Sequence, residues 1–195
     1  AQAESGANSA LPVPVFLASA APNGFQAAVP WPGNWTPGTK LMLKGPLGRG
    51  FSLPPAARKV VLASWSKSAG RVLALLEACR RQKAEMALLS DNTPEGLPLS
   101  VEVLPLAALS EVATWADYAA LDMPRDEIAN LLSDPALGSA LPRFTGYAQV
   151  FIETPVPCGG LAECGVCAVE TRKGIRMACK DGPVFDLAEI TKPQK

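Results

Sequence analysis

Four of the five cysteines fall within one short segment near the C-terminus, and their spacing limits the backbone more than any other feature of the sequence. Cys158, Cys164 and Cys167 follow the pattern C-x5-C-x2-C, and Cys179 comes after eleven further residues. Thiols that meet at one small centre require tight turns between them. The segment is rich in glycine, which adopts such turns at little steric cost. We therefore expect a compact, loop-rich unit built around these four side chains.

The spacing favours a metal centre, with three interpretations open. Plant-type two-iron clusters use C-x4-C-x2-C and a distant fourth cysteine, and this chain has one more residue in the first loop. Structural zinc is the second interpretation, but such sites usually show two separated C-x2-C pairs, and one is present here. Disulfides are disfavoured by the odd number of cysteines and by the lack of a secretion signal. We predict a 2Fe-2S cluster with the four ligands Cys158, Cys164, Cys167 and Cys179.

The residues between the last two of these cysteines predict a β-hairpin. The runs AVETR and IRMAC flank Lys173-Gly174, where glycine supplies the positive φ of a tight turn. Such a hairpin carries Cys179 back beside the first three sulfurs. The fifth cysteine, Cys79, is interpreted as a core residue, because it continues the apolar face of a predicted helix.

Composition excludes several classes of function. The 195 residues include no histidine, which removes Ser-His-Asp and Cys-His catalysis. The 18 basic residues balance the 18 acidic ones, so no net charge favours nucleic acid or an anionic membrane. No apolar run approaches the roughly 20 residues that span a bilayer. The N-terminus lacks the basic region of a secretory signal, so we expect a cytoplasmic protein.

The first part of the chain, residues 1–54, predicts a polar arm followed by a small β element. Asn23-Gly24 between two short apolar runs predicts a hairpin, and a strand is expected over residues 38–44. The loop GPLGRGF follows this strand. Its glycines could let the backbone approach a phosphate, which makes them candidates for a remnant flavin or pyrophosphate site: Gly45, Gly48 and Gly50.

Residues 55–145 predict a small α/β layer with a mainly parallel sheet. The runs KVVLAS, EMALLS and LSVEVLP read as strands, and helices are expected over residues 72–79, over residues 106–120 and from Pro124 onward. A dinucleotide site in such a layer needs a glycine-rich turn after the first strand. Here that turn reads ASWSKSAGR, with Lys67 and Arg71 interpreted as solvated surface residues. We expect a degenerate Rossmann-like layer that binds no NAD.

In its glycine loop, its α/β layer and its cysteine segment, the chain resembles the electron-transfer subunit of the two-subunit, NAD-linked class of dihydroorotate dehydrogenase, within the ferredoxin-reductase superfamily. The resemblance covers roughly residues 38–190. It rests on GPLGRGF at residues 45–51, on the α/β layer, and on PCGGLAECGVCAVETRKG and ACKDGPVF between residues 157 and 185. The resemblance implies an N-terminal FAD barrel, a middle NAD domain and a C-terminal 2Fe-2S domain, here residues 146–195. It also implies a role in pyrimidine biosynthesis, with electrons passing from NADH through FAD and the cluster to FMN in a partner subunit.

The 37 residues before Gly38 are too few for a full flavin barrel, so a truncated barrel is expected and FAD binding is left open. We therefore predict an accessory subunit that passes single electrons to or from a flavoprotein partner in a hetero-oligomer. The alternative is a zinc-stabilised or cluster-stabilised scaffold that docks to a partner without electron transfer.

Overall fold

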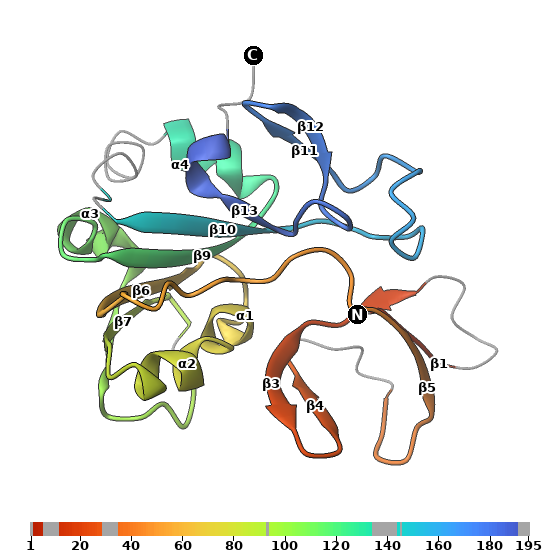
Figure 1. Ribbon diagram of the computed structural model, residues 1–195, viewed down its shortest axis with the longest axis horizontal. Helices are drawn as coiled ribbons and strands as arrows, with labels where there is room; N and C mark the ends of the chain where they lie inside the picture. The colour runs from red at the N-terminus through yellow and green to blue at the C-terminus, as the bar shows by residue number, and fades with distance from the viewer. Residues whose placement is uncertain are drawn as a thin grey trace.

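The computed structural model describes residues 2–5, 12–28, 35–92, 94–133, 144 and 146–190. The chain has an α/β fold, which confirms the predicted class, with a six-stranded sheet ordered β13-β10-β9-β6-β7-β8 (Figure 1). The strands of this sheet are β6 (Lys59–Ser64), β7 (Glu85–Leu89), β8 (Val101–Leu104), β9 (Tyr118–Pro124), β10 (Tyr147–Glu153) and β13 (Val184–Asp186). All neighbouring pairs are parallel except β10 and β13.

Short helices cover both faces of the sheet, so its central strands are buried on both faces and mostly apolar. In β6, Val60 and Leu62 belong to the core cluster that also contains residues of α1 (Gly70–Leu73) and α2 (Leu76–Arg81). Val61 and Ala63 alternate to the other face, with residues of α3 (Leu109–Val112) and α4 (Glu127–Ser133). Figure 1 shows the two helix layers on opposite sides of the strands. Cys79 of α2 is fully buried, as predicted for a core residue.

The prediction of a helix over residues 106–120 is confirmed only for residues 106–112 and is wrong for the rest. A 3-10 turn, η2 (Leu106–Ala108), leads into the short α3, and β9 begins at Tyr118. Residues 118–123 are all buried and β9 lies between β6 and β10, so burial on both faces favours a strand there. The next helix, α4, begins at Glu127 rather than at Pro124.

The N-terminal β element consists of two small sheets. The first contains β1 (Gln2–Ser5), β2 (Val13–Pro14) and β5 (Leu41–Lys44), and the second is the hairpin of β3 (Leu17–Ala21) and β4 (Gly24–Ala27). The predicted hairpin is confirmed, with Pro22-Asn23 as its turn. Part of the predicted arm is the strand β1, while residues 6–11 lie outside the described ranges.

The cysteine segment is inserted between two strands of the central sheet. It contains a separate hairpin of β11 (Ala168–Thr171) and β12 (Gly174–Met177), and a 3-10 turn, η4 (Leu187–Glu189), follows β13. The sheet therefore crosses the expected boundary between residues 145 and 146, and the division into three units stays a prediction. Among the described residues, no helix has the length and apolar character needed to cross a membrane.

Candidate functional site

The β11–β12 hairpin brings the last two cysteines of the segment together. Cys167 directly precedes β11 and Cys179 follows β12, while the amide of Ala178 donates to the carbonyl of Cys167 at 3.0 Å. The predicted hairpin is thus confirmed. Its turn is Arg172-Lys173, one residue earlier than expected, and the first residue of β12, Gly174, has the positive φ of 97°.

The sulfurs of Cys167 and Cys179 lie 3.4 Å apart, and both residues are buried. A disulfide would need about 2.05 Å. Two thiolates on one tetrahedral metal, with bonds of about 2.3 Å, lie about 3.8 Å apart. All five cysteines are free thiols in this structure, so the spacing of this pair is closer to that of shared metal ligands than to that of a disulfide.

The other two thiols lie on the loop between β10 and β11, where the backbone wraps around Cys158. Gly159, Gly160 and Gly165 have φ values of 67°, 82° and 72°, and Ala162 adopts 61° despite its Cβ. Burial raises the pKa of the Cys158 thiol, but hydrogen bonds from Cys164 and from the backbone at residues 160–162 outweigh it, so this pKa falls to about 6. Convergent N–H groups of this kind stabilise a thiolate.

Cys179 has the opposite electrostatic environment. Burial raises its pKa to about 11, helped by the hydrogen bond and charge of Cys167 and by the charge of Cys158, while the backbone at Ala162 lowers it. A thiol in this environment loses its proton readily only beside a compensating cation such as a metal ion. The contributions of Cys158 and Ala162 also indicate that both thiol pairs share one neighbourhood.

Within the described ranges, no group of three or more His, Cys, Asp or Glu side chains has the arrangement of a metal site. The four cysteines instead form two adjoining pairs, one of Cys167 with Cys179 and one of Cys158 with Cys164. Cluster binding therefore requires the two pairs to close toward one centre. The glycines of the loop allow such a movement.

The glycine loop GPLGRGF packs against the cysteine segment. A Cβ at Gly48, whose φ is 63°, would lie 1.9 Å from the carbonyl oxygen of Gly182. The neighbouring amide of Arg49 donates to the same oxygen, and Val184 donates to the Arg49 carbonyl at 3.3 Å. A Cβ at Gly160 would meet the Leu47 side chain at 2.8 Å. Close backbone contact thus accounts for glycine at Gly48, while no such contact surrounds Gly50.

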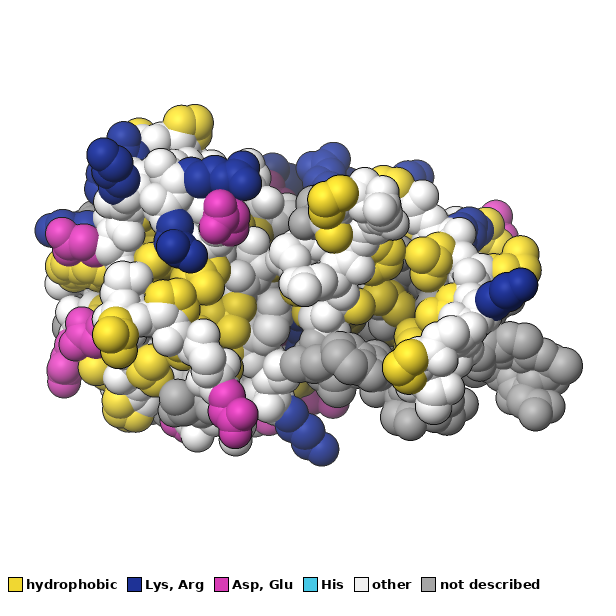
Figure 2. Space-filling view, turned by 90° about the horizontal axis from the view of Figure 1, so that it is seen from below, with side chains coloured by type: hydrophobic (Ala, Val, Ile, Leu, Met, Phe, Trp, Pro, Cys, Tyr) yellow, Lys and Arg dark blue, Asp and Glu magenta, His cyan; other side chains and the backbone are white. Residues whose placement is uncertain are grey.

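The same loop borders a cavity of about 740 Å³ between the N-terminal β element and the α/β layer. Its wall includes Phe16, Phe51 and Phe151, and it reaches both Arg71 and Cys179. Figure 2 views the molecule from the side of α2 and the β3–β4 hairpin, and apolar side chains gather in the middle of that face. Of the three candidate glycines, Gly48 and Gly50 line the cavity.

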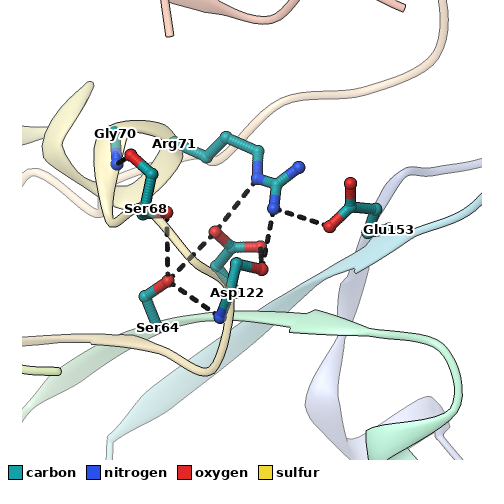
Figure 3. A network of polar contacts seen from close by, with 7 residues as sticks. Ser64, Ser68, Gly70, Arg71, Asp122 and Glu153 are labelled. Carbon is teal, nitrogen blue, oxygen red and sulfur yellow. Dashed lines mark hydrogen bonds and ion pairs between the residues drawn. The ribbon is translucent and has the colours of Figure 1, made fainter. Parts of the chain in front are cut away.

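A polar network fills the carboxyl ends of the parallel strands, where α/β proteins bind dinucleotides. Arg71 Nε donates to Asp122 Oδ2 at 3.0 Å, and its Nη2 donates to Ser66 Oγ at 2.7 Å and to Glu153 Oε2 at 2.8 Å. Ser64 Oγ adds a donor to Asp122 at 3.3 Å. Figure 3 shows the arginine reaching from α1 toward carboxylates on two strands. The crevice at the switch of strand order is thus occupied by the chain's own side chains.

Arg71 is buried, which corrects its interpretation as a solvated residue. Its guanidinium carbon lies 5.2 Å from the ring centre of Phe16 and 4.9 Å from that of Phe151. Burial lowers the pKa of Arg71, but the ion pairs with Glu153 and Asp122 outweigh it and raise the pKa above its usual value. One feature of the sequence indicates this network. Asp122 interrupts an apolar run, and a carboxylate in a buried strand needs a cation beside it.

Comparison with known proteins supports the metal centre and the fold separately. Residues 158–191 match the family model of the iron-sulfur cluster binding domain of dihydroorotate dehydrogenase B. A solved structure, described as that of an NADH-dependent reduced ferredoxin-NADP oxidoreductase and studied for flavin-based electron bifurcation, matches with a TM-score of 0.70. It is 16% identical, and the match covers 93% of this chain and 74% of the other. A search of curated proteins found no match.

The reductase-like fold and the matched domain together support an electron-transfer protein with an iron–sulfur centre. The matched domain confirms the resemblance over residues 158–191, and the solved structure confirms its reductase-like fold.

The packing of the glycine loop predicts different effects for two neighbouring substitutions. Gly48→Ala should lower the free energy of unfolding by at least about 2 kcal/mol, because a left-handed φ strains alanine and its Cβ would clash with backbone. Gly50→Ala, with open space around its Cβ, should change this free energy by no more than about 0.5 kcal/mol. Urea unfolding followed by circular dichroism measures both, and equal stabilities would contradict the packing role of Gly48.

Proposed function

We propose that this chain passes single electrons through a 2Fe-2S cluster, as an accessory subunit of a flavoenzyme that resembles dihydroorotate dehydrogenase. The proposed ligands are Cys158, Cys164, Cys167 and Cys179. The observation that carries the proposal is the pairing of Cys167 with Cys179 at 3.4 Å, next to a loop whose N–H groups converge on Cys158. The matched domain adds independent support for an iron–sulfur centre.

The chain's own residues supply position, charge and solvent exposure around the thiols. A bound 2Fe-2S cluster exchanges one electron at a time. N–H groups at residues 160–162 stabilise negative charge on the Cys158 sulfur. Cys167 and Cys179 are buried against the main core, whereas Cys164 is exposed. One side of the centre is therefore anchored in the sheet, and the other faces the surface where a partner can approach.

The surface around the exposed thiols suits a protein partner. Met42, Leu161 and Val166 expose 79%, 58% and 41% of their surface, and Met42 also lines a hollow beside Cys158. Apolar side chains gathered on a surface mark sites of protein contact. We propose a flavoprotein with an FMN site as the partner, in a cytoplasmic hetero-oligomer of pyrimidine biosynthesis. Co-purification from the native source, followed by flavin analysis, tests this pairing.

The cavity beside Cys179 favours a second cofactor within the same function. Its volume of about 740 Å³ falls in the range of small-molecule sites, and its aromatic wall suits a planar ring. A flavin there would lie between the N-terminal β element and the thiols. Such a flavin would exchange single electrons with the centre, whose other side faces the exposed surface. The alternative, a zinc-stabilised scaffold, predicts a colourless protein without acid-labile sulfide.

The ligand set predicts a distinct result for each class of cysteine. Single replacement of Cys158, Cys164, Cys167 or Cys179 by Ser should reduce bound iron and sulfide by at least about tenfold, because each removes a thiolate ligand. Cys79→Ser is the matched control, since this thiol lies in α2 within the other core cluster. Iron and sulfide analysis after reconstitution measures the result. Full loading of Cys164→Ser would remove it from the ligand set.

The cavity predicts flavin binding that a bulky side chain blocks. Wild-type protein should quench FAD fluorescence on titration, whereas Ala78→Trp, which fills the cavity from α2, should weaken binding at least about tenfold, or roughly 1.4 kcal/mol. Leu99→Trp adds the same ring at a fully exposed position outside the cavity and should bind as the wild type does. Equal FAD affinity in both variants would place any flavin elsewhere.

Because the Arg71 network fills the crevice at the carboxyl ends of the strands, we predict that the protein loaded with its cluster does not oxidise NADH. A dinucleotide needs the space that Arg71, Asp122 and Ser66 fill, and the turn after β6 lacks the glycine-rich phosphate loop. Calorimetry with NADH should show no binding, and mixing with an artificial electron acceptor should give no turnover. NADH-dependent bleaching of the cluster absorbance would contradict this prediction.

A further inference from the structure

Arg125 reaches from the end of β9 to the loop that carries Cys167. Its Nη1 donates to the carbonyl of Val166 at 2.9 Å and to that of Ala168 at 3.3 Å, the residues on either side of the cysteine. The backbone amide of Arg125 donates to the Glu153 carbonyl at 3.2 Å, at the end of β10. One residue therefore ties the cysteine loop to the carboxyl edge of the central sheet.

These contacts orient the peptide groups around the thiol. In a trans peptide the N–H points away from the C=O. Because the Val166 carbonyl is held toward Arg125, the Cys167 N–H points to the opposite side, away from the guanidinium. The Cys167 carbonyl accepts from Ala178, and the Ala168 amide donates to Gly165 at 3.1 Å. The backbone on both sides of Cys167 is thereby fixed.

Arg125 also brings a permanent positive charge to this loop. A reduced cluster carries one more negative charge than an oxidised one, so a nearby cation favours the reduced state. Arg125 is exposed, so solvent screens its charge and the effect is modest. We propose that Arg125 is a positioning residue that holds Cys167 in place and raises the reduction potential of the bound cluster, an inference that rests on the proposed cluster function.

Three variants separate geometry from charge. Arg125→Gln removes the charge and the long donor arm, whereas Arg125→Lys keeps the charge but loses the planar guanidinium. Arg172→Gln is the matched control. Arg172 is an exposed cation at the turn of the β11–β12 hairpin, about 16 Å along the strand from Cys167 and beyond the screening length in physiological salt.

The measurements are the midpoint potential, the rate of cluster release to a chelator, and hydrogen exchange of the Ala178 amide in the metal-free protein. Arg125→Gln should lower the potential, release the cluster about tenfold faster and speed exchange at Ala178. Arg125→Lys should keep the potential near that of the wild type while releasing the cluster faster. Arg172→Gln should match the wild type in all three.

Failure of the role proposed for Arg125 and failure of the proposed cluster function give different results. If the wild-type protein loads no iron, the proposed function fails, and the Ala178 exchange rates still decide whether Arg125 holds the loop. If the wild type loads and Arg125→Gln matches it in potential, release and exchange, the role of Arg125 is overturned. If Arg125→Gln does not fold, Arg125→Lys decides the question. The positioning role would be overturned if Arg125→Lys released the cluster and exchanged the Ala178 amide at the same rates as the wild type.

Discussion

The candidate centre depends on the strands at which the cysteine segment leaves and re-enters the central sheet. β10 and β13 pair with Phe151 opposite Val184, and the Ile152 amide donates to the Pro183 carbonyl at 2.9 Å. The ends of the segment are thus held side by side, and the chain between them must fold back on itself. Because Cys167 and Cys179 pack in the same core as these strands, sheet stability and thiol position are coupled. The segment behaves as an insertion into the sheet.

Arg71 links the rest of the fold to this sheet. Burying its guanidinium costs solvation free energy, and the cost is offset because Asp122, Glu153 and Ser66 accept its hydrogen bonds. Its faces contact Phe16 from the N-terminal element and Phe151 from β10. The same side chain therefore fills the crevice at the carboxyl ends of the strands and joins the small β element to the layer. One buried side chain therefore accounts both for the predicted lack of dinucleotide binding and for the packing of the N-terminal element on the layer.

Apart from the α/β class with its mainly parallel sheet, the features predicted correctly from the sequence are local ones. The β11–β12 hairpin follows from turn residues between two short runs, and Cys79 follows from helical periodicity. β9 was missed because its apolar run suits a helix as well as a strand, and only its place between two strands decides. The packing of Gly48 against Gly182 was not predicted, because the two residues lie far apart in the sequence. Arg71 was placed on the surface for the same reason, because its carboxylates come from distant strands.

The two sides of the candidate centre differ in their surroundings. Cys179 is buried and borders the large cavity, whereas Cys158 borders a hollow near the exposed Met42 and Leu43. The Arg71 network lies beside that cavity and fills the crevice at the carboxyl ends of the strands, which is why we predict that no dinucleotide delivers hydride there. A flavin in the cavity would then exchange electrons with the cluster alone. In the proposed relay, both the supply and the removal of electrons therefore depend on the partner that covers the exposed side of the cysteine loop.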